Sequence, residues 1–496
     1  MKSDFLHLRV ASGNILVDGL ASSAVDHRLE NSSGVQQGVY AEWNFDGKLL
    51  SVQTSRHGLV PLFAFITDAE VCISWSLLKV VEKTRRTEFD DDAIAVFLRV
   101  GYFLENDTPF KDVKVVRQSV FLSWTMRSFS LRQVGEESHT PYSGSREAAL
   151  QSYIELFSSA MQARLRSGAC ELPLSGGRDS RHILLELIRM RRKPSACVTC
   201  TFPPPRTNSD VALAKLLCDM LEIPHRVLKQ SGSFLRRALR KNLMTSLCTD
   251  EHTWALPLID GLGLKSSYTY DGIGGDVLSA GLFATPERLA HCRNGDAAAF
   301  ARDVLGGAAQ EVAWTRCLRK EALERFSYDR ALARMTLAVI PHMNKPNPIA
   351  SYFFWNRTRR EIALFTFRMY PAHITVYAPY LDDAVFDFLM ALPGELLLDH
   401  QFHTDAISQA FPAMSAVPYD LDDVEPNNPG FAYSFKLGAE ACAYVLARND
   451  DRWLEKGFVV PRLLLLATRG PRHFWLDLER LIWLTQLQRI TTTLSA

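Results

Sequence analysis

The hydrophobic pattern of this chain changes its period once, near residue 135. As far as about Val134, short stretches of alternating hydrophobic and polar residues are separated by turn residues, which is typical of a strand-rich domain. The stretches that predict strands most clearly are Leu49–Gln53, Leu62–Ile66, Val71–Ser74 and Val120–Trp124. A polar stretch from Gly135 to Gly144 then predicts a linker. We therefore expect a first domain over residues 1–134, a linker over 135–145 and a second domain over 146–496.

Beyond the linker, the hydrophobic residues first follow a helical spacing. Five apolar residues recur three or four positions apart, and Ser145 is the expected N-cap of the helix that they predict. These residues are Leu150, Ile154, Phe157, Met161 and Leu165. An apolar strand at Cys170–Leu174, a glycine-rich turn and a helix near Arg181–Met190 come next.

Strands continue to alternate with helices as far as about Tyr270–Ile273, which predicts a parallel sheet wrapped by helices. From about Pro286 onward, helical spacing dominates. Residues 459–490 predict amphipathic helices on both sides of Gly470-Pro471, and we expect them to pack against the protein rather than against a membrane. The predicted fold class is α/β with two domains.

Composition supports a globular chain without a strong surface charge. A length of 496 residues suits two domains, and 47% hydrophobic with 22% charged residues is typical of soluble proteins. Lys plus Arg (56) nearly balance Asp plus Glu (55), so we expect neither nucleic acid nor a membrane as a partner. No segment resembles a signal peptide or a membrane span, and nine scattered cysteines suggest reduced thiols. The expected location is therefore the cytoplasm.

Cys197 and Cys200 have the spacing of a possible metal or redox pair. They lie, however, in the apolar run 196–202, which predicts a buried strand. Residues three apart on a strand point to opposite faces, and no second cysteine pair completes a zinc site. We expect a strand of the core.

The segment that carries the most chemical information is Leu174-Ser-Gly-Gly-Arg-Asp-Ser180, between the predicted strand and helix. Two glycines allow the backbone N–H groups to approach a ligand, and the following helix adds the positive end of its dipole. The loop therefore suits a phosphate or pyrophosphate group, which the hydroxyls of Ser175 and Ser180 can also bind. Asp179 would repel a bare phosphate, so its presence implies a bridging Mg²⁺.

This loop is not a Walker P-loop, because no Gly-Lys-Ser/Thr follows the glycines. The alternative is a simple strand-to-helix turn in which Asp179 only begins the helix. The full six-residue pattern between a strand and a helix favours the phosphate-binding interpretation.

Residues 175–180 resemble the SGGxDS loop of ATP pyrophosphatases, and further segments resemble asparagine synthetases and their relatives. These segments appear in the family's order: Thr249-Asp-Glu251 for an acidic stretch, Gly272-Ile-Gly-Gly-Asp-Val-Leu-Ser-Ala-Gly281 for a second glycine loop, Pro379-Tyr-Leu-Asp-Asp383 for PFLD, and Ala391-Leu-Pro-Gly-Glu395 for LPxEL. The resemblance implies an adenine-nucleotide α-hydrolase-like second domain, with a parallel sheet and a helical C-terminal part.

The resemblance also implies ATP and Mg²⁺ as cofactors. A substrate carboxylate would attack the α-phosphorus of ATP, and an amine would then attack the acyl-adenylate to give an amide and AMP. Asp179 and Asp276 would hold Mg²⁺, with adenine against the strand near Val198. The residues expected to contact ATP or pyrophosphate are Leu174, Ser175, Gly176, Gly177, Asp179, Ser180, Val198, Gly272, Gly274 and Gly275.

The first domain resembles the glutaminase half of the same family, an Ntn-hydrolase-like αββα sandwich. The matching segments are Thr54-Ser-Arg-His-Gly-Leu-Val-Pro-Leu-Phe63, Ile73-Ser-Trp-Ser-Leu-Leu-Lys79 and Thr108-Pro-Phe-Lys-Asp-Val113. Active glutaminases of this family use an N-terminal cysteine. Here the sequence opens Met1-Lys2-Ser3 and the first cysteine is Cys72, so we expect no glutamine hydrolysis.

The residues expected on the acceptor side depart from the family pattern. Ile273 stands where relatives have an acidic residue or Tyr, and isoleucine cannot transfer a proton. Val277 replaces the usual Glu. Glu361 lies near the position of a catalytic glutamate in β-lactam-forming relatives, and its alternative is a surface ion pair with Arg357 on one helix.

The lysine that the family uses in adenylate formation is also missing, because its segment here reads Glu425-Pro-Asn-Asn-Pro-Gly-Phe431. Lys436 is the nearest lysine and could replace it, although a solvent-exposed side chain is the simpler interpretation. Arg178, beside the glycine loop, could supply the charge instead, since guanidinium pairs well with phosphate. Its alternative is an ordinary surface residue.

These features predict an ATP-dependent amide ligase without glutaminase activity, similar to lasso-peptide macrolactam synthetases and β-lactam synthetases. The expected partners are ATP, a small-molecule or peptide carboxylate with its amine, and a precursor peptide with a processing protease. Two alternatives are an asparagine synthetase that uses ammonia and a non-catalytic scaffold that binds nucleotide. A third, a tRNA-modifying enzyme with the same loop, is disfavoured by the neutral charge.

Overall fold

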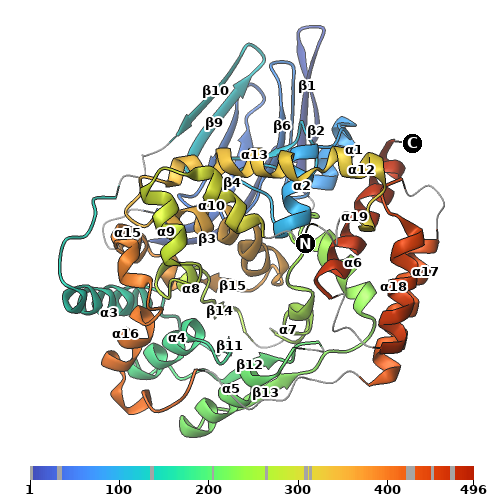
Figure 1. The fold of residues 1–496 in the computed structure, drawn as a ribbon. Helices are drawn as coiled ribbons and strands as arrows, with labels where there is room; N and C mark the ends of the chain where they lie inside the picture. Colours follow the sequence, from blue (N-terminus) through green and yellow to red (C-terminus); the bar gives the residue numbers. More distant parts are fainter. Residues whose placement is uncertain are drawn as a thin grey trace.

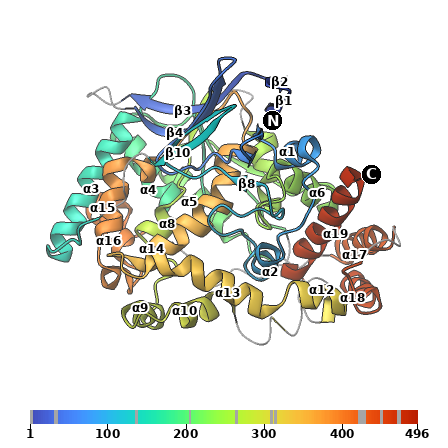
Figure 2. The same ribbon diagram turned by 90° about the horizontal axis from the view of Figure 1, so that it is seen from above.

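The computed structural model describes residues 4–30, 36–133, 139–203, 206–262, 266–306, 311, 316–419, 430–447, 452–469 and 475–495. Antiparallel sheets of the N-terminal part form one end of the molecule (Figure 1). Short parallel strands and most of the helices form the remainder, and the view from above shows α13 (Tyr328–Val339) along one side of the molecule (Figure 2). The predicted α/β fold class is confirmed.

The N-terminal part contains two five-stranded sheets in which every described strand pair is antiparallel. The first has the order β2 (Asn14–Gly19), β1 (Phe5–Ala11), β7 (Glu70–Ser74), β6 (Phe63–Ile66), β8 (Lys114–Val115). The second has the order β10 (Ser128–Gln133), β9 (Val120–Thr125), β5 (Leu50–Thr54), β4 (Gln36–Phe45), β3 (Ser22–Glu30). Each of the four predicted strands is present, with ends that differ by a residue.

Large side chains fill the centre of this N-terminal part. Alternate residues of β5 are buried, as the sequence pattern predicts for a strand with one face toward the core. Trp43 and Trp75 pack ring against ring with centroids 5.0 Å apart, and both are buried. Helix α1 (Leu77–Thr84) packs against β6 and β7, and α2 (Asp91–Val100) packs against α13.

The second part begins with α3 (Arg146–Ala163), whose N-cap Ser145 accepts a hydrogen bond from the Ala148 N–H, as predicted. Parallel strands follow in the order β11, β12, β13, and β14 pairs in parallel with β15. β11 lies beside β14, so the five strands run side by side. Their bounds, with those of the intervening helices, are β11 (Glu171–Pro173), α4 (Arg178–Arg189), β12 (Ala196–Cys200), α5 (Ser209–Met220), β13 (His225–Leu228), β14 (Tyr268–Tyr270) and β15 (Thr375–Tyr377).

Helices make up most of the remaining chain, as the spacing beyond Pro286 predicts. They are α6 (Phe234–Met244), η1 (Thr253–Ala255), α7 (Leu256–Gly261), α8 (Gly275–Leu278), α9 (Pro286–Arg293), α10 (Ala297–Leu305), α12 (Lys320–Arg325), α13 (Tyr328–Val339), η2 (Ile340–His342), α14 (Pro348–Phe353), η3 (Phe354–Ile362), η4 (Phe365–Met369), η5 (Pro379–Leu381), α15 (Asp383–Ala391), η6 (Gly394–Leu397), α16 (Phe402–Ala410), η7 (Pro412–Met414), α17 (Phe431–Leu446), α18 (Lys456–Arg469) and α19 (Trp475–Ser495).

The two parts share a buried polar interface. Arg360, on η3, donates from Nη2 to the carbonyl oxygen of Asp107 at 2.8 Å, and Arg359 donates from Nη2 to Oδ1 of Asn106 at 3.1 Å. Both arginines are about 4% exposed. Buried arginines that donate to oxygen atoms of another segment fix the relative position of the elements that carry them.

All nine cysteines are free and buried, and Cys197 and Cys200 lie in β12, so the interpretation of this segment as a core strand is confirmed. Within the described part of the chain, none of the helices has both the length and the apolar character needed to cross a membrane.

Candidate functional site

The predicted glycine loop connects β11 to α4 as a compact turn. Leu174 is tied to the sheet, because its N–H donates to the carbonyl oxygen of Val198 at 2.9 Å. Within the loop, the N–H of Ser175 donates to Oγ of Ser180 at 3.1 Å, and the N–H of Gly177 donates to Oγ of Ser175 at 3.2 Å. Hydroxyls at both ends of the motif therefore hold the turn at the N-terminus of α4.

Gly176 lies at a position with no room for a side chain. A Cβ there would lie 2.5 Å from Cδ1 of Leu213, on α5. The N–H of Gly176 donates to Oδ1 of Asp210, in the first turn of α5, at 2.7 Å. Asp210 was not found from the sequence, because an acidic residue in the first turn of a helix is common there.

The second glycine loop packs directly against Asp179. A Cβ on Gly272 would lie 2.6 Å from Cβ of Asp179, and a Cβ on Gly275 would lie 2.5 Å from its Oδ1. Gly274 has a φ of +90°, which disfavours L side chains. These glycines allow the two loops to meet, although they lie about a hundred residues apart in the sequence.

Asp179 and Asp276 share this meeting point. Burial and the charge of Asp276 raise the pKa of Asp179 well above its ordinary value, although the backbone N–H of Asp276 donates to the Asp179 carboxylate. Burial also raises the pKa of Asp276, which the charge of Arg357 partly offsets. Two carboxylates held together with little solvent are unfavourable without a cation.

A magnesium ion suits the donors of this pair. Mg²⁺ is commonly held by one or two carboxylates together with water and phosphate oxygens, and a divalent charge would offset the repulsion between Asp179 and Asp276. The part of the chain that the structure describes contains no cluster of three or more His, Cys, Asp or Glu side chains with metal-binding geometry. A substrate phosphate would therefore have to complete the coordination.

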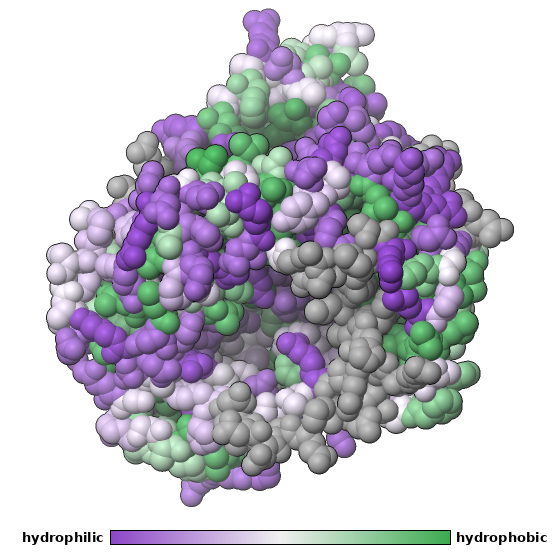
Figure 3. Space-filling model, viewed as in Figure 1, coloured by the Kyte–Doolittle hydropathy of each residue, from purple (hydrophilic) through white to green (hydrophobic). Residues whose placement is uncertain are grey.

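Both loops line one cavity of about 260 Å³ at the carboxyl ends of the parallel strands. The face shown in Figure 3 is hollowed over β14 and α8. Of the predicted ATP-binding residues, those that line the cavity are Leu174, Ser175, Asp179, Ser180, Val198, Gly272 and Gly274, together with Asp276. Gly176, Gly177 and Gly275 belong to the same loops but do not line it.

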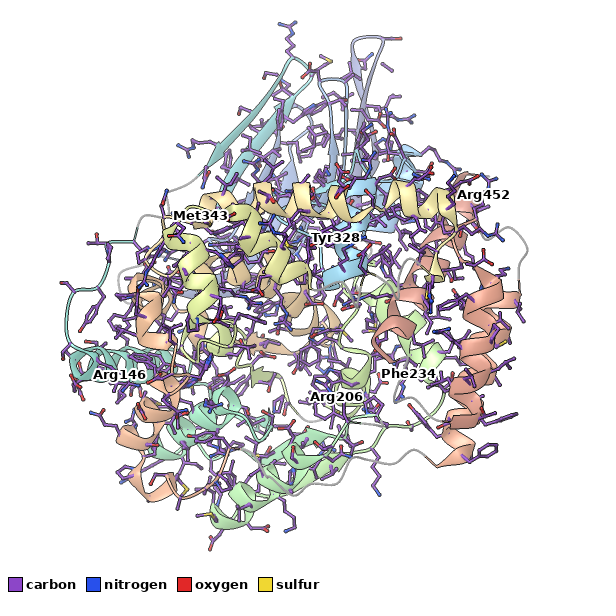
Figure 4. All side chains as sticks on the ribbon, viewed as in Figure 1. Arg146, Arg206, Phe234, Tyr328, Met343 and Arg452 are labelled. Atoms are coloured by element: carbon purple, nitrogen blue, oxygen red, sulfur yellow. The ribbon has the colours of Figure 1, made fainter. Side chains whose placement is uncertain are left out.

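An aromatic wall faces the glycine loops across the cavity, and sequence reasoning missed it. It consists of Phe202, Trp254 and Phe365, from three distant segments. The rings of Phe202 and Trp254 are 4.8 Å apart, and His252 stacks on Phe365 at 5.3 Å. Arg206, labelled near the centre of Figure 4, lies over the Phe202 ring with Cζ at 4.7 Å. Such a wall can accept a planar base or another apolar group.

Glu361 forms the ion pair with Arg357 that the sequence suggested, with Nε and Oε2 3.3 Å apart. The pair does not lie on a helix surface, however, because Glu361 is only 1% exposed and η3 runs through the interior. Thr249 also donates from Oγ1 to Glu361 at 3.1 Å. Burial, and then the charge of Glu251, raise the pKa of Glu361 well above its ordinary value. Glu361 does not line the cavity.

The two candidate cations are not brought to the cavity either. Lys436 is exposed on α17, because this helix turns Leu437, Gly438 and Ala441 toward its neighbours instead. Arg178 donates from Nε to Oγ1 of Thr404 at 2.6 Å and does not line the cavity, although its charge partly offsets the raised pKa of Asp179. The segment 425–429, expected to match the family's lysine region, lies outside the described residues.

Both glycine loops follow the carboxyl ends of parallel strands, the place where open α/β sheets bind their ligands. The family model described as asparagine synthase matches residues 153–406, which is just over half of the chain. The chain belongs to the asparagine synthase family.

Other comparisons add little. Comparison with curated proteins gives no match. A solved structure described as the allosteric regulatory enzyme of purine biosynthesis matches at 10% identity over 41% of this chain and 50% of that chain, with a TM-score of 0.15. The chain thus spans half the length of that structure.

Proposed function

We propose that this chain is an AMP-forming amide ligase. A substrate carboxylate attacks the α-phosphorus of ATP, pyrophosphate leaves, and an acyl-adenylate forms. An amine then attacks the acyl carbon, which gives an amide and releases AMP and a proton. The observation that best supports this proposal is the single cavity lined by the first glycine loop, Asp179 and Asp276.

Each wall of the cavity has a proposed role. The Ser175 and Ser180 hydroxyls and the N-terminus of α4 bind the pyrophosphate oxygens. Adenine lies along β12 at Val198, near the aromatic wall. Asp179 and Asp276 would hold Mg²⁺, which when bound would neutralise charge on the departing pyrophosphate. With ATP and Mg²⁺ present, both aspartates are expected to be ionised, because an opposite charge lowers a raised carboxyl pKa.

We propose a peptide or another natural-product carboxylate as the substrate, rather than aspartate. Ile273 lines the cavity and is 4% exposed, where relatives use an acid or Tyr on the acceptor side. An apolar residue here suits a substrate that carries its own amine, or one whose amine binds away from Ile273. A precursor peptide and its processing protease are the partners that fit a macrolactam-forming version of this reaction.

We also propose that the N-terminal part is a degenerate glutaminase-like domain that acts as a scaffold. Cys72, the first cysteine of the sequence, is fully buried in β7. Burial raises the pKa of its thiol to about 12, so it forms almost no thiolate at neutral pH. Trp43 and Trp75 fill space between the sheets. These features argue against a cysteine nucleophile among the described residues.

Pyrophosphate exchange tests the adenylation step. The protein is incubated with ATP, Mg²⁺, labelled pyrophosphate and a panel of peptide and amino-acid carboxylates. We expect label to enter ATP only with a cognate carboxylate, and Asp179→Asn to reduce the rate at least 100-fold, since it removes one of the charges that hold the metal. Robust asparagine formation from aspartate and ammonium would favour the asparagine synthetase alternative. Nucleotide binding without exchange for any carboxylate would favour the non-catalytic scaffold.

A further inference from the structure

A group of buried polar side chains lies directly behind the first glycine loop. We call it the His403 cluster, and its members are His403, Tyr380, Ser279, Tyr153 and His182. His403, on α16, is 0% exposed. Its Nδ1 lies 3.4 Å from Oδ1 of Asp179 and 3.0 Å from Oγ of Ser279. Its Nε2 lies 3.2 Å from the Tyr380 hydroxyl and 3.2 Å from Nδ1 of His182.

The hydrogen bonds of Ser279 determine which nitrogen of His403 carries the proton. Ser279 has one hydroxyl proton and donates it to the carbonyl oxygen of Gly275 at 2.8 Å. Tyr153 donates to the same Oγ at 3.2 Å. Oγ of Ser279 is therefore the acceptor toward Nδ1, so Nδ1 bears the proton, and the Asp179 carboxylate faces the same nitrogen at 3.4 Å. Nε2 is then the acceptor, and the groups within hydrogen-bond distance of its one lone pair are the Tyr380 hydroxyl and Nδ1 of His182.

The cluster connects both glycine loops to one imidazole. His403 reaches the carboxylate of the first loop directly, and it reaches the backbone of the second loop through Ser279 and Gly275. Tyr380 adds a contact to the first loop, since its hydroxyl lies 3.3 Å from the carbonyl oxygen of Asp179. A Cβ on Gly275 would meet Cζ of Tyr380 at 3.0 Å, so the packing leaves Asp179 little freedom.

We propose that His403 is a positioning residue, whose Nδ1–H holds the Asp179 carboxylate in the orientation that binds the divalent cation. This inference rests on the proposed function, because it concerns the same site. It adds a residue that lies 224 positions from Asp179 in the sequence and does not line the cavity. Residues that hydrogen-bond to a metal-binding carboxylate without binding the metal fix its orientation. Their loss commonly reduces metal affinity 10- to 100-fold.

Mn²⁺ binding tests the inference without depending on activity. The free Mn²⁺ signal is followed by electron paramagnetic resonance as the purified protein is titrated in the presence of α,β-methylene-ATP. We expect His403→Ala to weaken Mn²⁺ binding 10- to 100-fold. His403→Asn should restore most of the affinity, because its amide nitrogen takes the place of Nδ1. His403→Gln, whose amide reaches the position of Nε2, should not restore it.

The matched control is His342→Ala. His342 is also a buried histidine with polar partners, since its Nδ1 lies 2.7 Å from Oγ of Ser351, but it does not contact Asp179. We expect this variant to bind Mn²⁺ like the unaltered protein. If His403→Ala does not fold, the comparison of the Asn and Gln variants decides the question. Equal Mn²⁺ affinity in these two variants would overturn the positioning role.

Pyrophosphate exchange then distinguishes a failure of the positioning role from a failure of the proposed function. If His403 acts by positioning, His403→Ala needs 10- to 100-fold more Mg²⁺ to reach half of its maximal exchange rate. Its exchange rate, relative to that of the unaltered protein, is then closer to normal at saturating Mg²⁺ than at low Mg²⁺. If the unaltered protein neither binds Mn²⁺ nor exchanges pyrophosphate, the proposed function fails. If it does both and His403→Ala matches it at every Mg²⁺ concentration, only the positioning role is overturned.

Discussion

Replacement of Gly275 by alanine tests the close approach of the two glycine loops. The added Cβ would lie 2.5 Å from Oδ1 of Asp179, 2.6 Å from its Cγ and 3.0 Å from Cζ of Tyr380. Overpacking of this kind usually costs about 1–3 kcal/mol. Because Gly275 does not have a positive φ, alanine also restricts the unfolded chain, which stabilises a protein by about 0.4–1 kcal/mol. The expected net loss is therefore about 1–2 kcal/mol.

This loss corresponds to an unfolding equilibrium about 5- to 30-fold less favourable to the native state. It is measured by urea denaturation followed by tryptophan fluorescence, and Mn²⁺ affinity should fall in the same variant because Asp179 must move. The matched control is Gly430→Ala, since a Cβ there meets nothing within 4 Å. If Gly275→Ala were as stable as Gly430→Ala and bound Mn²⁺ normally, the tight contact between the loops would be refuted.

Two further predictions concern the aromatic wall and a buried carboxyl group. Trp254→Ala should weaken ATP binding about 5- to 150-fold, as expected for the loss of about 1–3 kcal/mol of base stacking. Calorimetry should show unchanged pyrophosphate binding in this variant. An equal loss of affinity for both ligands would contradict adenine stacking. Burial raises the pKa of Glu479 to about 7 from 4.5. The folded state favours the neutral acid, so the contribution of Glu479 to the free energy of unfolding is fully present below pH 4.5. This contribution, about 3 kcal/mol, is lost as the pH rises through 7. Glu479→Gln should therefore reduce the pH dependence of the free energy of unfolding over this range. An unchanged pH dependence would contradict the raised pKa of Glu479.

Local sequence patterns predict the elements of this fold well. Ser145 begins α3 because a hydroxyl before an amphipathic stretch can bind the free N–H groups of the first turn. β5 and β9 follow from alternation, since a strand with one buried face needs a period of two. The glycine loop and its following helix are also local features. Each of these predictions depends on residues within a few positions of one another.

The complete site cannot be predicted in this way, because parallel strands bring distant segments to one edge of a sheet. Asp210, Trp254 and His403 lie in segments that have no distinctive local pattern. Position in the sequence also does not show what a side chain binds: Arg178 adjoins the loop, yet it donates to Thr404 and does not line the cavity. Glu361 shows the same limit, since spacing predicts its ion pair with Arg357 but not its burial.

The charges around the cavity make divalent cations essential to the proposed reaction. Among the described residues that line it, there are four aspartates (Asp179, Asp210, Asp271 and Asp276) and neither lysine nor arginine. ATP brings further negative charge, so the two would repel each other in a site where burial weakens screening. The dipole of α4 supplies only about half a positive charge, which is too little to offset four carboxylates. In the proposed reaction, cations held by Asp179 and Asp276 would therefore supply the positive charge that the cavity lining lacks, and adenylation would depend on the orientation of these two carboxylates.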